Sequence, residues 1–186
     1  MAITLKKGNT FNLTKKEPTL KKIMIGLGWE VKQGNALDLD ASIFMINSKG
    51  KLPQDEYFIF YNNLQSPDGA VKHTGDNRTG AGDDDDEMVL ANLDTISSNV
   101  AEILIIVSIH DAETRRHNFG MLSDAYIRIL DMETKREILR YDLDAEYPTN
   151  TDIEFGRLRK ENNEWIFVAS GIGGNKGLQG YVDTYA

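Results

Sequence analysis

Short runs of β-branched and aromatic residues, separated by glycine, asparagine, aspartate and proline, recur along most of the 186-residue sequence. This rhythm is typical of strands joined by turns. The segments 48–50, 67–69 and 161–163 have turn composition, and each joins two such runs. We therefore expect strands at 23–29, 37–47, 56–61, 88–93, 102–110, 125–131, 137–143, 151–160 and 165–170.

The spacing of these strands predicts an all-β fold, a mostly antiparallel β-sandwich. No stretch of ten residues has a firm helical period, and residues 111–122 are expected to form a short helix or a long loop. A chain of this length can bury its own core, so we expect a single domain over residues 1–186. The glycine-rich stretch at 171–180 is not a dinucleotide-binding loop, because Lys176 stands where the third glycine should fall. Since glycines mostly occur in loops, we expect this stretch to be a flexible tail with turns and the segment 171–186 to be peripheral.

The composition excludes several classes of function. The chain has 29 acidic and 21 basic residues, a net charge of −8, whereas nucleic-acid binding normally requires a basic face. It has no cysteine, which rules out disulfides and thiolate metal sites. It also has no apolar run of about 20 residues and no N-terminal signal region, so we expect no membrane span and a cytoplasmic location.

Two aspartates alternate with apolar residues in the expected strand 37–47. Asp38 and Asp40 should share one face, with Cα atoms roughly 6.5 to 7 Å apart, while the alternate apolar residues face a core. Both carboxylates could reach one ion between them. The same alternation is equally typical of an ordinary half-exposed strand in an antiparallel sheet.

A second polar segment runs from position 75 to position 87. It begins with a glycine-rich loop containing Asp76 and Asn77, which offers carboxylate, amide and backbone oxygens. Five consecutive acids follow, and a bound divalent cation would relieve their mutual repulsion. Polar turns and solvated acidic loops have similar compositions, but this run lies directly between the loop and an apolar strand. The acids are Asp83, Asp84, Asp85, Asp86 and Glu87.

These oxygen-rich segments favour calcium over other metals. Zinc prefers Cys and His, and the three histidines, His73, His110 and His117, are scattered along the sequence. Magnesium demands a tighter octahedral geometry and keeps more of its waters. The pattern is not an EF-hand, because Ile43 and Met88 occupy the sixth positions counted from Asp38 and Asp83, where that loop requires glycine. The sequence therefore predicts calcium-binding loops at one end of the sandwich.

The motifs resemble those of the TerD family of tellurium-resistance and general stress proteins. The most specific is the segment 73–80, His-Thr-Gly-Asp-Asn-Arg-Thr-Gly, followed by Asp-Asp-Glu at 85–87. The resemblance covers roughly residues 2–180. Further matching segments are Gly26-Leu-Gly-Trp29, Asp38-Leu-Asp-Ala-Ser42, Phe58-Ile-Phe-Tyr-Asn62, Ser66-Pro-Asp-Gly69, Ile109-His-Asp-Ala112, Asn118-Phe-Gly120 and Arg140-Tyr-Asp-Leu143.

The resemblance implies a β-sandwich that binds two calcium ions. It also implies a role in resistance to tellurite and other stresses, with other tellurium-resistance proteins as partners in a membrane-associated complex and no enzymatic activity. This chain has Asp84 where the family commonly has glycine. This difference affects whether Asp83 or a neighbouring carboxylate reaches the ion. The implied ligands are Asp38, Asp40, Asp76, Asn77, Asp83, Asp85, Asp86 and Glu87.

Two other interpretations remain open from the residues alone. Paired acids can hold metal ions for hydrolysis, and His110 with Asp111 at a strand end could then act as base and orienting group. Against this, the sequence has no Gly-x-Ser-x-Gly elbow, P-loop or cysteine nucleophile. The third interpretation is a scaffold in which calcium is purely structural, which a measured affinity would separate from a sensor.

Overall fold

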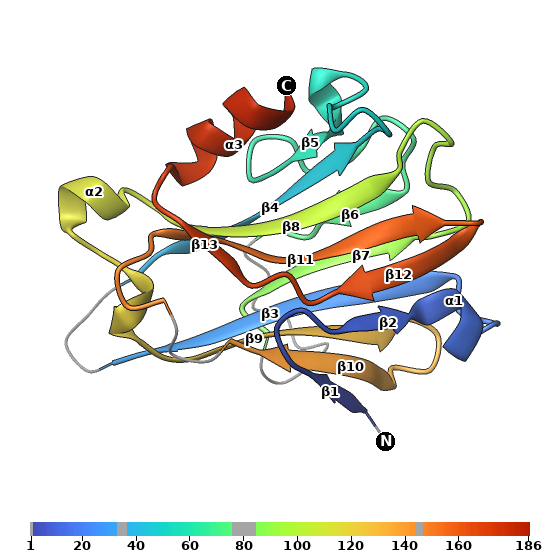
Figure 1. Cartoon of the computed structure of the whole chain (residues 1–186), viewed down its shortest axis with the longest axis horizontal. Coiled ribbons are helices and arrows are strands. Elements are labelled where there is room, and N and C mark those ends of the chain that lie inside the picture. The colour runs from blue at the N-terminus through green and yellow to red at the C-terminus, as the bar shows by residue number, and fades with distance from the viewer. Residues whose placement is uncertain (1, 33–36, 76–84, 144–146) are drawn as a thin grey trace.

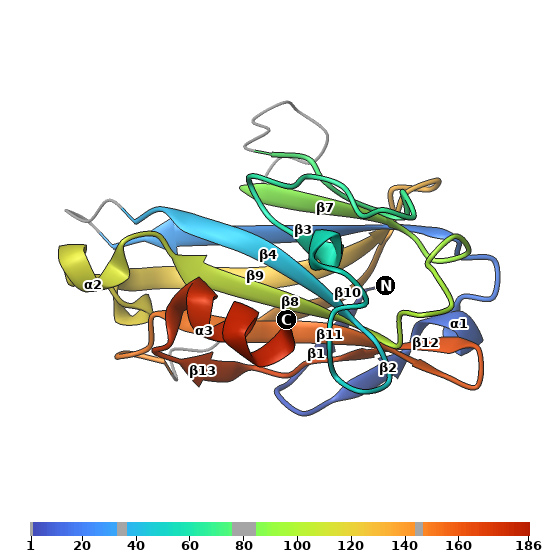
Figure 2. The same ribbon diagram turned by 90° about the horizontal axis from the view of Figure 1, so that it is seen from above.

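Two facing β-sheets form the body of the protein (Figures 1 and 2). The computed structural model describes residues 2–32, 37–75, 85–143 and 147–186. One sheet has the strand order β1 (Ile3–Leu5), β10 (Glu137–Asp142), β9 (Leu122–Asp131), β3 (Lys22–Val31), β7 (Glu87–Asn92) and β6 (Val71–His73). The other has the order β2 (Thr10–Asn12), β12 (Glu164–Val168), β11 (Asp152–Glu161), β8 (Glu102–Ile109), β4 (Leu39–Ile46) and β5 (Phe58–Ile59), and β13 (Ile172–Gly174) pairs with β11.

The predicted mostly antiparallel β-sandwich is confirmed. Every pairing between the described strands is antiparallel except that of β1, which runs parallel to β10. All nine expected strands are present, with boundaries shifted by a few residues, and the one at 56–61 shrinks to the two residues of β5 after a 3-10 turn, η1 (Asp55–Tyr57). Four further short strands, which were not predicted from the sequence, are present: β1, β2, β6 and β13.

The core lies between the sheets and follows the alternation of the strands. The inward face of β4 carries four buried apolar side chains, as the alternation predicted. Both strands are also apolar and buried on their outer face, where Phe44 and Ile46 of β4 lie with Leu104 and Ile106 of β8. A strand that is apolar on both sides needs a second cover on its outer face.

That cover is the C-terminal helix α3 (Gly177–Tyr185), and both views place it against β4 and β8 (Figures 1 and 2). Leu178, Tyr181 and Val182 pack on the outer apolar cluster of these two strands. The expectation of a flexible tail at 171–186 is therefore wrong. Glycine is not typical of strands or helices, yet Gly173 and Gly174 lie in β13 and Gly177 and Gly180 lie in α3, where the apolar residues recur at helical spacing.

The remaining helical elements are single turns. They are α1 (Leu13–Lys16), α2 (Ala112–Arg115) and a 3-10 turn, η2 (Phe119–Met121). α2 and η2 occupy the region 111–122, where the sequence predicted a short helix or a loop. α2 lies at the end of the molecule where β3 ends and β4 begins, at the left of both views (Figures 1 and 2). None of the described helices combines the length and apolar character needed to cross a membrane.

Candidate metal site at one end of the sandwich

Glu87 connects the two sheets at this end. It begins β7, and its Oε2 accepts a hydrogen bond of 2.5 Å from the backbone N–H of Ala41 in β4. The short edge strand β5 pairs with Ile43 and Phe44 of β4 and stops before Ala41. Glu87 thus supplies the acceptor that a longer edge strand would provide, and this places its carboxylate beside Asp40.

Asp38 and Asp40 lie at the start of β4, opposite the end of β8. The carbonyl of Asp38 accepts a hydrogen bond from the N–H of His110, and Asp40 pairs with Ser108. Burial raises the pKa of the Asp40 carboxyl, and the negative charges of Glu87 and Asp38 raise it further, while His110 opposes them. Asp38 and Glu87 therefore lie close enough to Asp40 for their charges to act on it, and a nearby cation would offset that repulsion.

Asp86 lies one residue before β7, beside β3. Its Oδ2 accepts a hydrogen bond of 2.8 Å from the N–H of Trp29, and its own N–H donates to the carbonyl of Leu27. The Asp86 side chain thus continues the pairing between the two strands beyond the start of β7. Its second oxygen, Oδ1, has no hydrogen bond within the described part of the chain and is the candidate ligand atom.

Asp85 has a different environment from its neighbours. Its side chain is fully buried, and both carboxylate oxygens are bound by the guanidinium of Arg128 at 2.9 to 3.1 Å. The hydroxyl of Tyr126 donates a further hydrogen bond of 2.9 Å to Oδ1. The structure therefore places Asp85 in an ion pair on the outer face of its sheet, whereas Glu87 reaches across to the other sheet.

The other predicted ligands lie outside the described residues. These are Asp76, Asn77 and Asp83. Within residues 2–32, 37–75, 85–143 and 147–186, no group of three or more His, Asp or Glu side chains is arranged so that it could hold a metal ion. Asp38, Asp40, Asp86 and Glu87 are therefore separate candidate ligands, and within the described part of the chain they do not form a metal site by themselves.

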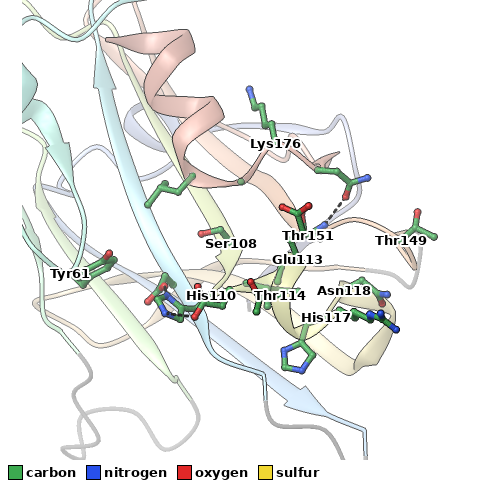
Figure 3. A pocket seen from close by; sticks show the side chains of 18 residues that line it. Tyr61, Ser108, His110, Glu113, Thr114, His117, Asn118, Thr149, Thr151 and Lys176 are labelled. Atoms are coloured by element: carbon green, nitrogen blue, oxygen red, sulfur yellow. Dashed lines mark hydrogen bonds and ion pairs between the residues drawn. The ribbon is translucent and has the colours of Figure 1, made fainter.

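A polar groove of about 830 Å³ opens next to Asp40 (Figure 3). His110 lies at its edge, with Nδ1 at 3.5 Å from Asp40 Oδ2 and Nε2 at 3.4 Å from Asp111 Oδ2. Ser108 of β8 and residues before α3, including Lys176, also line it. Figure 3 shows the Lys176 side chain turned away from His110, and its ammonium lies 3.9 Å from the centre of the Tyr181 ring.

His73 was not among the predicted ligands, yet it lies beside the candidate ligand Glu87. Only 3% of its side chain is exposed, and its Nε2 lies 3.5 Å from Oε2 of Glu87. The available signal was the alternation in β6, where Val71 and His73 are buried and Lys72 between them is exposed. A buried histidine can lie beside a carboxylate without being a metal ligand, as His73 does.

The fold and the acidic end define a class: a two-sheet β-sandwich with carboxylates gathered where the sheets meet. The family model for the TerD domain matches residues 1–185. The tellurium resistance protein TerD of Serratia marcescens is 46% identical over 187 residues, covering 100% of this chain and 97% of that protein. The general stress protein 16U of Bacillus subtilis (strain 168) is 43% identical over 188 residues, covering 100% and 97%. The chain belongs to the TerD family.

Solved structures agree on the fold. A crystal structure of a homologue of telluride resistance protein (TerD) from Streptomyces coelicolor A3(2) superposes with a TM-score of 0.69. The alignment covers 87% of this chain and 95% of that one at 18% identity. At that identity the likeness establishes the shared β-sandwich architecture and nothing about the site.

Proposed function

We propose that this protein binds calcium at the end of the sandwich and acts in tellurite resistance and stress response by binding rather than by catalysis. The observation that carries the proposal is the bond from Ala41 to Glu87. It fixes a carboxylate of one sheet beside Asp40 of the other. The sequence offers further oxygen donors, Asp76, Asn77 and Asp83, in the segment between β6 and β7.

The available donors fit calcium. Every candidate ligand binds through oxygen, and calcium takes six to eight oxygens in a flexible geometry. Asp38, Asp40 and Glu87 would hold one face of an ion. Burial raises the pKa of the Asp40 carboxyl, the charges of Glu87 and Asp38 raise it further, and a bound cation would offset both effects. Asp76, Asn77 and Asp83 would supply further oxygens for that ion or for a second one. A bound ion would neutralise the charge that gathers at this end.

Asp85 has a separate role within this proposal. Because Arg128 and Tyr126 occupy its oxygens, it would support the site by anchoring the chain just before Asp86 and Glu87. A positively charged guanidinium held on the same carboxylate competes with a cation. We therefore expect Asp85 to contribute less to calcium affinity than Asp40 does.

The cellular role is supported by the names of relatives, which include tellurium resistance and general stress proteins. The proposed action is calcium-dependent binding to other tellurium-resistance proteins in a membrane-associated complex, from a cytoplasmic location. Direct capture of tellurite is not part of the proposal, because an oxyanion is repelled by acidic loops and the chain has no thiol to reduce it.

Calorimetric titration of the chelator-treated protein tests calcium binding. We expect stoichiometric heat with calcium and little heat with equimolar magnesium. Asp40→Asn and Glu87→Gln should each weaken binding, whereas Asp94→Asn should not, because Asp94 is an exposed acid just beyond the opposite end of β7. The absence of calcium heat in the unsubstituted protein would refute the proposal.

A metal-dependent hydrolase is the alternative, and the position of His110 between Asp40 and Asp111 beside the groove is the observation that favours it. A histidine flanked by carboxylates can act as a general base. Under this alternative His110→Ala abolishes a metal-dependent hydrolysis of phosphate esters while calcium affinity is retained. If a panel of phosphate esters is not hydrolysed in the presence of metal, the binding function stands alone.

A further inference from the structure

The groove beside Asp40 has a floor built from neighbouring strands. Asp40 of β4 and Asp152 of β11 are both register partners of Ser108 in β8, so the three residues lie in one row across the outer face of the sheet. Asp152 is fully buried, whereas Asp40 and Ser108 line the groove. The groove extends from Tyr61 at one side of Figure 3 to Thr149 at the other, and its volume of about 830 Å³ is typical of a small-molecule site.

The hydroxyl of Ser108 has no partner, although the residue is almost completely enclosed. Only 6% of Ser108 is exposed, and its hydroxyl makes no hydrogen bond within residues 2–32, 37–75, 85–143 and 147–186. Buried hydroxyl groups normally find a partner, because an unpaired one loses its bonds to water without compensation. Since the Ser108 side chain lines the groove, its partner has to come from whatever occupies the groove.

The carboxylate next to Ser108 is only weakly compensated. The Asp40 side chain is 22% exposed, and the one basic group that the described chain brings within ion-pair distance of it is His110, at 3.5 Å. Asp38 and Glu87 add negative charge beside Asp40 rather than neutralising it. A half-buried carboxylate in such surroundings is stabilised by a positively charged hydrogen-bond donor.

Two basic side chains line the groove, and neither forms an ion pair with an acid in the described part of the chain. The ammonium of Lys176 lies over the Tyr181 ring, 3.9 Å from its centre. Arg116 follows α2 as its C-terminal cap, with a φ of +56°. The groove wall also carries Asp111, and its nearest guanidinium, that of Arg115, is 4.0 Å away in an exposed pair that solvent screens. The wall therefore retains acceptors for a cationic ligand.

We propose that this groove binds a guanidinium group, the head group of arginine, between the carboxylate of Asp40 and the hydroxyl of Ser108. A guanidinium has five donors in a planar fork, which suits a carboxylate and a hydroxyl that lie side by side on neighbouring strands. Its flat face stacks on aromatic rings, and the ring of Tyr61 is 53% exposed in the groove wall.

An organic cation makes lower demands on the groove than a metal ion does. No three acids or histidines of the described residues are arranged to hold a metal, whereas a guanidinium needs one carboxylate at its edge and further acceptors around it. The inference goes beyond calcium binding and does not depend on it. The guanidinium can belong to free arginine or to an arginine side chain of a peptide, and the two sources share the same chemistry.

NMR titration of the unsubstituted protein with N-acetyl-arginine methylamide, in a calcium-free buffer with chelator, tests the inference. We expect saturable shifts in the amide signals of residues 108–112 and 176–178. The citrulline derivative has the same shape without the charge and should bind at least about 10-fold more weakly. Free arginine and the peptide Gly-Arg-Gly, titrated in the same way, distinguish a small-molecule site from a peptide site by which of them binds more tightly. Equal affinity for the arginine and citrulline derivatives, or no saturable shift with any arginine compound, would overturn the inference.

Substitutions in the groove test the named partners. Ser108→Ala should weaken binding of the arginine derivative by about 10-fold without lowering the melting temperature, because the hydroxyl has no partner in the described protein. Asp40→Asn should weaken it at least as much, and Tyr61→Ala by about 2- to 5-fold. The control Asp94→Asn, an exposed acid beyond the opposite end of β7, should leave the affinity unchanged. Unchanged affinity in both Ser108→Ala and Asp40→Asn would contradict the assignment. Because chelator is present throughout, this outcome is independent of whether the protein binds calcium.

Discussion

The buried ion pair between Asp85 and Arg128 spans a strand that separates them. Asp85 lies two residues before the start of β7, and Arg128 belongs to β9. In the sheet, β3 lies between β7 and β9. The pair crosses β3 at Gly26, which is the register partner of Arg128. A side chain at position 26 would occupy the space that the Asp85 carboxylate fills.

Arg128→Met tests the energetic weight of this pair. Removing Arg128 leaves the buried Asp85 carboxylate without a counter-charge, with the hydrogen bond from the Tyr126 hydroxyl remaining, and loss of a buried partner typically costs about 3 to 5 kcal/mol. We expect a loss of this size in the free energy of unfolding, measured by urea denaturation. The matched control is Arg136→Met, which breaks an exposed pair with Glu17 and should have a far smaller effect. Equal losses in the two variants would contradict the prediction.

Gly26→Ala tests the close approach at β3. The added methyl group overlaps the Asp85 carboxylate and forces it away from Arg128. Overpacking of this kind costs about 1 to 3 kcal/mol, and we expect a lower denaturation midpoint. Glu30→Ala, at an exposed position of the same strand, should leave the midpoint almost unchanged. A variant with alanine at position 26 and full stability would show that the pair can move at no cost.

Asp152→Asn tests how α3 is attached to the sheet. The Asp152 side chain lies under the start of α3, where its Oδ2 accepts from the N–H of Gly177 and its Oδ1 accepts from the hydroxyl of Tyr181. An amide offers one acceptor fewer in a buried position, at a cost of about 1 to 3 kcal/mol. We expect faster hydrogen exchange in residues 177–185 and unchanged exchange in β3. Asp183→Asn, an exposed change on the same helix, is the control.

Alkaline denaturation should depend on Tyr181. Burial and the Asp152 carboxylate raise the pKa of Tyr181 above its ordinary value near 10. The unfolded chain therefore loses this proton near pH 10 while the folded protein keeps it. The stabilising contribution is complete below pH 10 and declines above it by about 1.4 kcal/mol per pH unit for one proton. Tyr181→Phe should make the free energy of unfolding less dependent on pH between 10 and 11, and an unchanged slope would refute this.

Much of the fold was predictable because strand and turn signals are local. Alternation in β4 correctly placed Leu39, Ala41, Ile43 and Met45 on the core side, and the turn residues separated nine strands correctly. The strands that were missed are each three residues long, and such short strands depend on their neighbours rather than on their own composition. The C-terminal stretch was misjudged for the same reason, since α3 is stabilised by packing on Leu104 and Ile106.

The sequence by itself determined the β-sandwich class, the acidic character and the residues offered to a cation, because alternation, charge and side-chain chemistry are local properties. Only the tertiary structure decided how neighbouring acids divide their roles. Asp85 is neutralised by Arg128 across β3, whereas Glu87, two residues later, faces His73 and Ala41 between the sheets. These partners are distant in the sequence, and the electrostatic environment of a carboxylate depends on what the fold brings within a few ångströms of it.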